Sequence, residues 1–238
     1  MTDLIPTKIN QQHDIDTIRN EILRKGYYLA NTGQICDERE LTRLIDALGG
    51  FWQQGGPQVI APLPNPTFIA QTTDEIPPHN ECAYAAQPPR HLLLHCQENQ
   101  VQGGDFFLVD SNHVLKTLSS ELFALLYYAK FQCRINPSHP ETVSLLQRNE
   151  RGEYHLQYSC IGHTEDWNDH LNYVPLAPLY QGYETIIPSL QAQLRREDLR
   201  QTRKWEQGDL LIFDNRRFLH GRNAFQGSGR RLDHLRIH

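Results

Sequence analysis

The chain has 238 residues, of which 39% are apolar and 21% charged, and its formal net charge is −5. This composition is typical of a folded globular protein and excludes a disordered chain. The negative charge argues against a general affinity for nucleic acid or anionic lipid. No apolar run approaches the ~20 residues that cross a bilayer, and the first residues lack the pattern of a signal peptide. The five cysteines form no C-x-x-C pair, which favours a reducing cytoplasm over a disulfide framework or a zinc knuckle.

Helical periodicity predicts four helices, over residues 14–26, 37–49, 119–130 and about 182–203. The first two begin at Asp14 and Asp37, space leucine and isoleucine at helical intervals, and end at glycine. Pro188 lies near the first turn of the last one or at a kink within it.

Short runs of β-branched and aromatic residues, separated by proline, glycine and asparagine, predict strands. They cover residues 58–63, 67–71, 91–96, 106–110, 154–159, 210–214 and 230–238. Because strands and helices do not alternate regularly, the pattern indicates a mostly β protein with flanking helices, built as a sandwich or barrel. We expect a single domain over residues 1–238, with a helical part over 1–50 packed on the β core.

Histidine and carboxylate together suggest a metal centre. Two imidazoles and one carboxylate on one face of an iron(II) ion leave three positions open for substrate and oxygen. On a strand, residues i and i+2 project to the same side, so the pattern H-x-E supplies two of these ligands. With 12 histidines and 28 acidic residues, random placement predicts about 1.4 such patterns of either acid. The sequence holds three, so at least one is expected to be coincidental.

The three patterns differ in context. His139 and Glu141 lie in a proline-flanked, turn-like stretch, where a solvated loop histidine is the better interpretation. His163 and Glu165 follow a predicted strand and remain a rival metal site. His79 lies two residues before Glu81 in the segment Ile-Pro-Pro-His-Asn-Glu-Cys-Ala-Tyr.

Several motifs in a fixed order accompany the pattern at residue 79. They are Pro-His-Asn-Glu at 78–81, Pro-Pro-Arg-His-Leu-Leu-Leu at 88–94, Gly-Gly-Asp at 103–105, and Trp-Glu-Gln-Gly-Asp-Leu-Leu-Ile-Phe-Asp-Asn-Arg-Arg-Phe-Leu-His-Gly-Arg at 205–222. Together they resemble the taurine dioxygenase and clavaminate synthase family of iron(II)/2-oxoglutarate oxygenases. The resemblance covers roughly residues 60–238 and is poor from 134 to 204.

The resemblance implies a double-stranded β-helix, or jelly-roll, core, with Fe(II), 2-oxoglutarate and O2 as cofactor and cosubstrates. His79 and Glu81 correspond to the family's first histidine and carboxylate ligands, and His220 corresponds to the second histidine.

The family also places an arginine ten to fifteen residues after the second histidine, where it holds the distal carboxylate of 2-oxoglutarate. Spacing selects Arg231, with Arg230 or Arg236 as alternatives. A planar guanidinium suits this task because it grips a carboxylate through two parallel hydrogen bonds. On an extended strand Arg230 and Arg236 face one way and Arg231 the other.

Two positions depart from the family pattern. Phe106 stands where the family usually has a threonine whose hydroxyl helps bind 2-oxoglutarate. The second arginine expected four residues after the first is Leu235 if Arg231 leads, or His234 if Arg230 leads. Cosubstrate binding is therefore less well specified by the sequence than iron ligation.

Other residues near the motifs have two interpretations. Asp214 and Asn215 either orient a ligand through hydrogen bonds or simply form a turn, and the turn explains Asn215 more simply. Trp205 is most simply a core aromatic. Three residues are candidates for substrate contact or plain packing: Asn80, Tyr84 and Arg222. With Arg222, Arg216 and Arg217 are compatible with an acidic substrate or with solvation.

The resemblance implies hydroxylation of an unactivated C–H bond in a small, amino-acid-like metabolite. Desaturation or ring formation by the same chemistry stays open, whereas halogenation is disfavoured because Glu81 fills the position that chloride would need. The alternative is a β-barrel that binds without catalysis or holds another metal.

Overall fold

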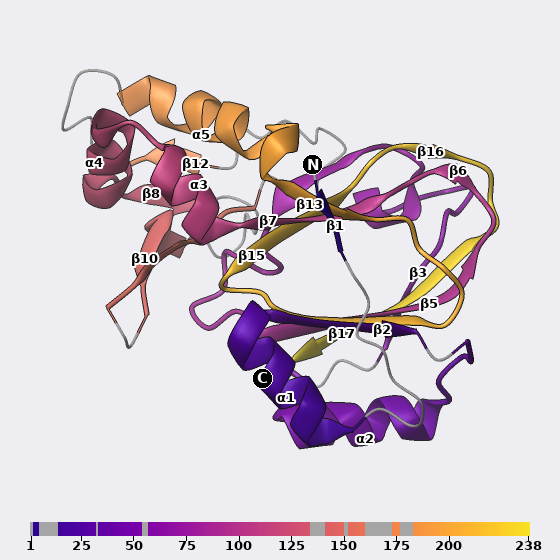
Figure 1. Cartoon of the computed structure of the whole chain (residues 1–238). Coiled ribbons are helices and arrows are strands. Elements are labelled where there is room, and N and C mark those ends of the chain that lie inside the picture. The colour runs from indigo at the N-terminus through magenta and orange to yellow at the C-terminus, as the bar shows by residue number, and fades with distance from the viewer. Residues whose placement is uncertain are drawn as a thin grey trace.

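The computed structural model describes residues 2–4, 14–31, 33–53, 57–133, 141–149, 152–159, 173–176 and 183–238. Two five-stranded sheets face each other at its centre, and helices cover their outer faces (Figure 1). The first sheet runs in the order β1 (Thr2–Asp3), β13 (Arg200–Arg203), β7 (Phe106–Asp110), β15 (Phe218–Arg222) and β4 (Ile76–His79). The second runs in the order β2 (Tyr27–Asn31), β14 (Asp209–Asp214), β5 (His91–Asn99), β17 (Arg230–Ile237) and β3 (Gln58–Ile60). This arrangement confirms the predicted β-rich fold with flanking helices.

Three smaller sheets complete the β structure. One contains β12 (Tyr173–Pro175), β8 (Phe131–Cys133) and β9 (Glu141–Val143), another pairs β10 (Leu146–Arg148) with β11 (Tyr154–Leu156), and the last pairs β16 (Phe225–Gln226) with β6 (Gln102–Gly103). The helices are α1 (Ile15–Lys25), α2 (Glu38–Leu48), α3 (Ser111–Thr117), α4 (Ser120–Tyr128) and α5 (Ile186–Leu194). Short 3-10 turns lie at Ile69–Gln71, Tyr183–Thr185 and Glu197–Leu199.

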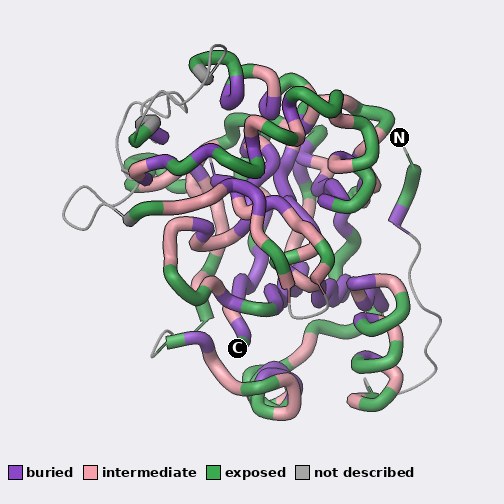
Figure 2. The backbone as a smooth tube through the Cα atoms, turned by 90° about the vertical axis from the view of Figure 1, so that its left-hand side faces the viewer, coloured by how far each residue is buried: buried purple, intermediate pink, exposed green. Residues whose placement is uncertain are grey.

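Side-chain alternation along the strands separates three hydrophobic layers. On β14, Leu211 and Phe213 pack between the two main sheets, whereas Leu210 and Ile212 pack outward against α1 and α2. Figure 2 shows the buried segments running through the centre of the molecule, with exposed segments around them. The space between the two sheets is therefore closed along its sides, and one end of it stays open for a cavity.

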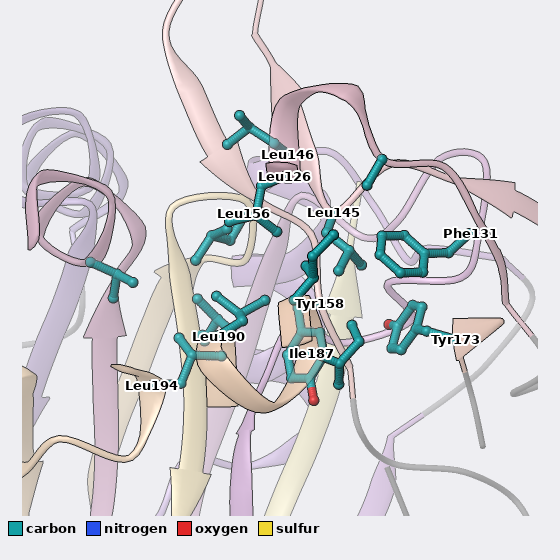
Figure 3. Close-up of a cluster of buried hydrophobic side chains, with 14 of the residues drawn as sticks. Leu126, Phe131, Leu145, Leu146, Leu156, Tyr158, Tyr173, Ile187, Leu190 and Leu194 are labelled. Carbon is teal, nitrogen blue, oxygen red and sulfur yellow. The ribbon is translucent and has the colours of Figure 1, made fainter. Parts of the chain in front are cut away.

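The third layer covers the outer face of the first sheet with α3, α4, α5 and the small sheets. In Figure 3, Tyr158, Tyr173 and Phe131 lie close together, and their ring centroids are 5.5 Å (Tyr158–Tyr173) and 6.0 Å (Phe131–Tyr173) apart. This apolar layer fixes the end of the first sheet that carries the functional side chains.

The N-terminal helices begin and end as the sequence indicates. The Asp14 carboxylate accepts a hydrogen bond from the Thr17 amide at 2.7 Å, and that of Asp37 accepts one from the Glu40 amide at 2.8 Å. Gly26 ends α1 in the left-handed region with φ 84°. Both helices pack on the second sheet.

Two predicted elements are wrong. The segment 67–71 is not a strand, because Thr67 donates through its amide and hydroxyl to Gln71 Oε1 and the chain turns locally. The helix predicted over 182–203 ends at Leu194, and Arg200–Arg203 forms β13 instead, paired with β7 and β1. Tertiary pairing overrides helical periodicity there.

Candidate active site

The strand pair β4–β15 brings His79 and His220 together. The two residues are direct partners in the antiparallel ladder, and their ring centroids lie 4.1 Å apart. Strand β4 contains Pro77 and Pro78, which lack amide donors, and it is an edge strand, where proline is tolerated. The sequence prediction missed both strands.

Glu81 completes a cluster of three. One ligand atom from each of His79, Glu81 and His220 lies within 4.8 Å of the others. His79 and His220 are 6% and 7% exposed, so these polar groups face a cavity and not bulk water. Two imidazoles and a carboxylate with open positions are the donor set that suits iron(II).

Hydrogen bonding leaves the histidine ligand atoms free. His79 Nδ1 lies 3.0 Å from the Pro77 carbonyl oxygen, to which the protonated nitrogen donates, so Nε2 keeps its lone pair. The Nδ1 atom of His220 is buried and has no hydrogen-bond partner among the described residues. Burial, followed by the nearby His79, holds the pKa of His220 well below its ordinary value, which favours the neutral form that binds metal.

The carboxylate of Glu81 is kept ionised. Burial alone raises its pKa, but the adjacent His79 and His234 and the guanidinium of Arg236 outweigh burial and hold the pKa well below the usual range. Arg236 contacts Glu81 directly, with Nε and Nη2 at 2.7 and 2.6 Å from Oε1. A charged carboxylate in a buried site is ready to bind a cation.

Asparagine side chains hold the backbone around Glu81. Asn215 accepts from the Glu81 amide at 2.8 Å and donates to its carbonyl at 3.1 Å. Asn80 is buried and donates to the carbonyls of Asn215 and Phe218. Asn215 therefore fixes the backbone of Glu81, which goes beyond the simple turn expected, and the amide of Asn80 contacts backbone carbonyls instead of the cavity. The Asp214 carboxylate accepts from the amides of the next turn, as turn chemistry predicts.

A cavity of about 650 Å³ opens in front of the three ligands. Its wall includes Tyr84, Phe106 and Trp205, together with Arg222, Arg230 and Arg236. Arg216 and Arg217 instead line a second cavity beside α1, so they do not contact a substrate held at the cluster. Trp205 is more than a core aromatic, because its buried Nε1 has no acceptor among the described residues.

The arginine chosen by spacing faces the wrong way. Arg231 is exposed, lies outside the cavity and donates to Gln97 on the outer side of the sheet. Arg230 and Arg236 project to the cavity side, in accordance with strand alternation. Arg231 therefore does not line the cavity, because the number of residues after His220 does not determine which face of β17 turns inward.

Arg230 and Arg222 form a buried pair of cations. Their guanidinium carbons lie 5.2 and 4.7 Å from the Phe225 ring centroid, and neither has a carboxylate within 4.0 Å among the described residues. Burial lowers the pKa of Arg230 to about 10 and, with the neighbouring Arg230 charge, that of Arg222 to about 9, so both stay protonated at neutral pH. The buried Nε atoms of both have no hydrogen-bond partner within the described ranges. Two desolvated cations with free donors fit an anionic ligand such as the carboxylate of 2-oxoglutarate.

Gly104 explains part of the Gly-Gly-Asp motif. Its φ is 76°, and a Cβ atom there would lie 2.6 Å from Arg230 Nη1. Arg230 Nη1 also donates to the Gly104 carbonyl at 2.7 Å. The motif therefore makes room for the guanidinium that faces the cavity.

The rival motifs are not tested by this geometry. His139, His163 and Glu165, as well as the Glu141 side chain, lie outside the described residues.

Among the described residues, no helix is long and apolar enough to cross a membrane.

Solved structures share this fold. PvcB from Pseudomonas aeruginosa aligns with a TM-score of 0.74 and 18% identity, over 94% of this chain and 80% of that one. A taurine dioxygenase from Burkholderia xenovorans aligns with 0.71 and 16%, over 98% and 83%. Asparagine oxygenase in complex with Fe(II), 3-hydroxyasparagine and succinate aligns with 0.71 and 19%, over 94% and 77%. At these identities the likeness concerns the fold, and it confirms the expected jelly-roll core.

The relatives found by sequence are longer than this chain. Dioxygenase str8 from Strobilurus tenacellus is 26% identical over 178 residues, which cover 68% of this chain and 38% of that protein. Gamma-butyrobetaine dioxygenase from Homo sapiens is 25% identical over 182 residues, which cover 70% and 44%. The chain thus spans less than half of the length of these relatives.

A family model described as taurine catabolism dioxygenase TauD, TfdA family, matches residues 32–237. That match covers nearly all of the β core, including the cluster of His79, Glu81 and His220. The chain belongs to the TauD/TfdA family of Fe(II)/2-oxoglutarate-dependent dioxygenases.

Proposed function

We propose that the protein hydroxylates an unactivated C–H bond of a small, amino-acid-like metabolite, with His79, Glu81 and His220 as the iron ligands. The observation that carries this proposal is the meeting of these three side chains within 4.8 Å at the wall of one cavity. When bound, iron(II) and 2-oxoglutarate supply the oxidising chemistry, with O2 consumed and succinate and CO2 released. The protein supplies position and a cavity that excludes water.

Cosubstrate binding is assigned to Arg230. Its buried guanidinium faces the cavity with no carboxylate partner among the described residues, and Arg222 lies beside the same Phe225 ring. Phe106 offers no hydroxyl; its ring centroid lies 5.4 Å from that of Trp205, whose indole N–H has no acceptor in the described part of the chain and is a donor on that wall. We assign the distal carboxylate of 2-oxoglutarate to this group of donors.

The substrate class follows from the rest of the cavity. The wall carries aromatic and amide side chains, among them Trp52, Gln53 and Phe68. Apolar surface with a few polar groups suits a small molecule. The structural likeness to asparagine oxygenase agrees with an amino acid or a derivative. Desaturation or ring formation of the same substrate remains an alternative outcome.

The cysteines support a reducing compartment. Those among the described residues, Cys36, Cys82, Cys96 and Cys133, form no disulfide with one another. Reduced cysteines persist in the cytoplasm, where we propose that the enzyme acts.

A substrate screen tests the proposal. The protein is incubated with Fe(II), ascorbate, 2-oxoglutarate and single amino acids or their derivatives, and succinate release is measured together with the mass of the product. We expect the substrate to stimulate succinate formation and to give a product about 16 Da heavier, which is the mass of one added oxygen atom. A loss of about 2 Da instead identifies desaturation or ring closure. If anaerobic protein shows no visible absorption band with Fe(II) and 2-oxoglutarate, the binding-barrel alternative replaces the proposal.

A further inference from the structure

The carboxylate of Glu81 is held asymmetrically. Both Nε and Nη2 of Arg236 approach the same oxygen, Oε1, at 2.7 and 2.6 Å. The other oxygen, Oε2, lies 3.8 Å from His79 Nε2, on the side where the ligand cluster forms. One oxygen is therefore engaged by the guanidinium, and the other is turned toward the metal position.

This orientation needs an external constraint. A glutamate side chain has one more rotatable bond than an aspartate, so fixing its carboxylate costs more conformational entropy. The other side chain close to Oε1 among the described residues is the Cys82 thiol, a weak donor at 3.8 Å. The charge-assisted hydrogen bond from Arg236 Nε, together with the ion-pair contact of Nη2 to the same oxygen, outweighs one contact of that kind.

Arg236 is itself anchored. Its Nη2 donates to Gln58 Oε1 at 3.1 Å, and its carbonyl accepts from the Trp52 amide at 2.9 Å. It lies on β17 in the second sheet, whereas Glu81 follows β4 of the first. The ion pair thus joins the two sheets at the wall of the cavity.

We propose that Arg236 is a positioning residue that holds Glu81 as a metal ligand through one oxygen. This inference rests on the proposed function, because it requires a metal at the cluster. The role is distinct from that of Arg230, which lies on the same face of β17 but makes no ion pair with Glu81. The guanidinium fork and not the positive charge alone performs the task.

Metal titration of the full chain tests the inference without turnover. Co(II) serves as the probe, and its affinity is measured for the wild type, Arg236→Lys and Arg236→Gln. The matched control is Arg231→Gln, on the same strand but exposed on the outer side. Loss of a residue that orients a ligand typically costs 10- to 100-fold in metal affinity, so we expect about that loss in both Arg236 variants and less than about 3-fold in the control. Full affinity in Arg236→Lys would show a role of charge alone and overturn the inference.

The visible absorption spectrum of bound Co(II) provides a second measurement, which would not change if Arg236 only stabilised the fold. We expect the band intensities to change in both Arg236 variants, because a released carboxylate binds through two oxygens and changes the coordination number. Thermal unfolding of the metal-free variants identifies any that fail to fold, and Arg236→Lys serves if Arg236→Gln does not fold. Unchanged affinity and spectrum in folded variants contradict the inference.

A double-mutant cycle with Glu81→Asp completes the test. The shorter aspartate cannot reach the guanidinium in the same way, so Arg236→Gln should weaken Co(II) binding much less in that background. Additive losses would mean that Arg236 does not act through Glu81. If the wild type binds no Co(II) in a manner that depends on His79 and His220, the proposed function itself fails, and this outcome is distinct from equal binding by wild type and variants.

Discussion

Histidine lies beside a carboxylate in two places. His95 and Asp233 lie on the outer face of the second sheet, whereas His79, His220 and Glu81 lie at the cavity. The two groups differ in the hydrogen bonding of their histidine nitrogens. His95 is fully buried on the outer face; its Nδ1 pairs with Asp233 at 3.0 Å, and its Nε2 accepts from the Cys36 amide at 3.1 Å. In the inner group, His220 Nδ1 has no partner among the described residues. A histidine with both nitrogens hydrogen-bonded has none left for a metal, whereas His220 keeps that capacity and lies within the cluster of His79 and Glu81.

We expect the largest effect from substitution of the histidines in the inner group. His79→Ala and His220→Ala each remove a ligand, so we expect Fe(II)-dependent succinate formation and Co(II) binding to fall below detection. His163→Ala should largely spare both. Anaerobic metal titration and a succinate assay measure the outcome; the opposite pattern would transfer the site to the pattern at His163 and Glu165.

The two faces of β17 should differ in their effect on cosubstrate binding. Arg230→Gln removes a buried cation that faces the cavity, and loss of a hydrogen bond to a charged group costs about 2 kcal/mol, or about 30-fold in affinity for 2-oxoglutarate. Arg231→Gln, on the outer face, should change that affinity less than about 2-fold. Titration of the Fe(II)-loaded protein under anaerobic conditions gives both constants. Equal losses would restore the assignment made from spacing.

Substitution of His95 tests the structural interpretation of the outer group. His95→Phe leaves the Cys36 amide and the Asp233 carboxylate without that partner, so we expect the free energy of unfolding to fall by about 2–3 kcal/mol. Denaturant unfolding measures the loss, and Co(II) affinity should stay at the wild-type value. A marked loss of metal affinity in folded protein would contradict the division into structural and ligand histidines.

Acid stability gives the smallest effect. Burial raises the pKa of Asp233, but hydrogen bonds from His95 and Gln97 outweigh it and hold the pKa below the ordinary value of 3.8. The ionised form therefore stabilises the fold above the unfolded-state pKa, and this contribution is lost as the pH falls from about 4 toward the lower folded-state pKa. Asp233→Asn should show a shallower loss of unfolding free energy over that range. The exposed Asp46→Asn serves as the control, and identical slopes in all three proteins would refute the assignment.

Local signals predicted the elements that depend on local chemistry. The caps at Asp14 and Asp37 and the terminating Gly26 define helices whose ends match the prediction. The sequence prediction failed at β4. Two prolines argue against a strand in the sequence, but β4 lies at the edge of its sheet and needs ladder hydrogen bonds on one side only. The prediction failed again at Arg200–Arg203, where pairing with β7 decides the conformation.

The three clustered side chains of the candidate site were predictable from the sequence, but the residues around them were not. An H-x-E pattern, within ordered motifs, selected His79, Glu81 and His220, and the fold brings these three side chains together. The roles of Asn215 and Arg236 around Glu81 left no local signal, because these residues come from distant strands. Trp205 was identified as a core aromatic because the sequence cannot show that its indole nitrogen lacks an acceptor.

The sequence alone determined the chemistry available to this protein: a globular β-rich chain, three candidate metal ligands and a set of arginines near its C-terminal end. The tertiary structure decided which of those arginines face the cavity. Strand alternation makes Arg230 and Arg231 face opposite sides, but the inner side is defined by what the sheet packs against, with α2 and Leu235 outside and Phe106 and Leu232 within. That choice is a property of the assembled layers and not of any local stretch of sequence.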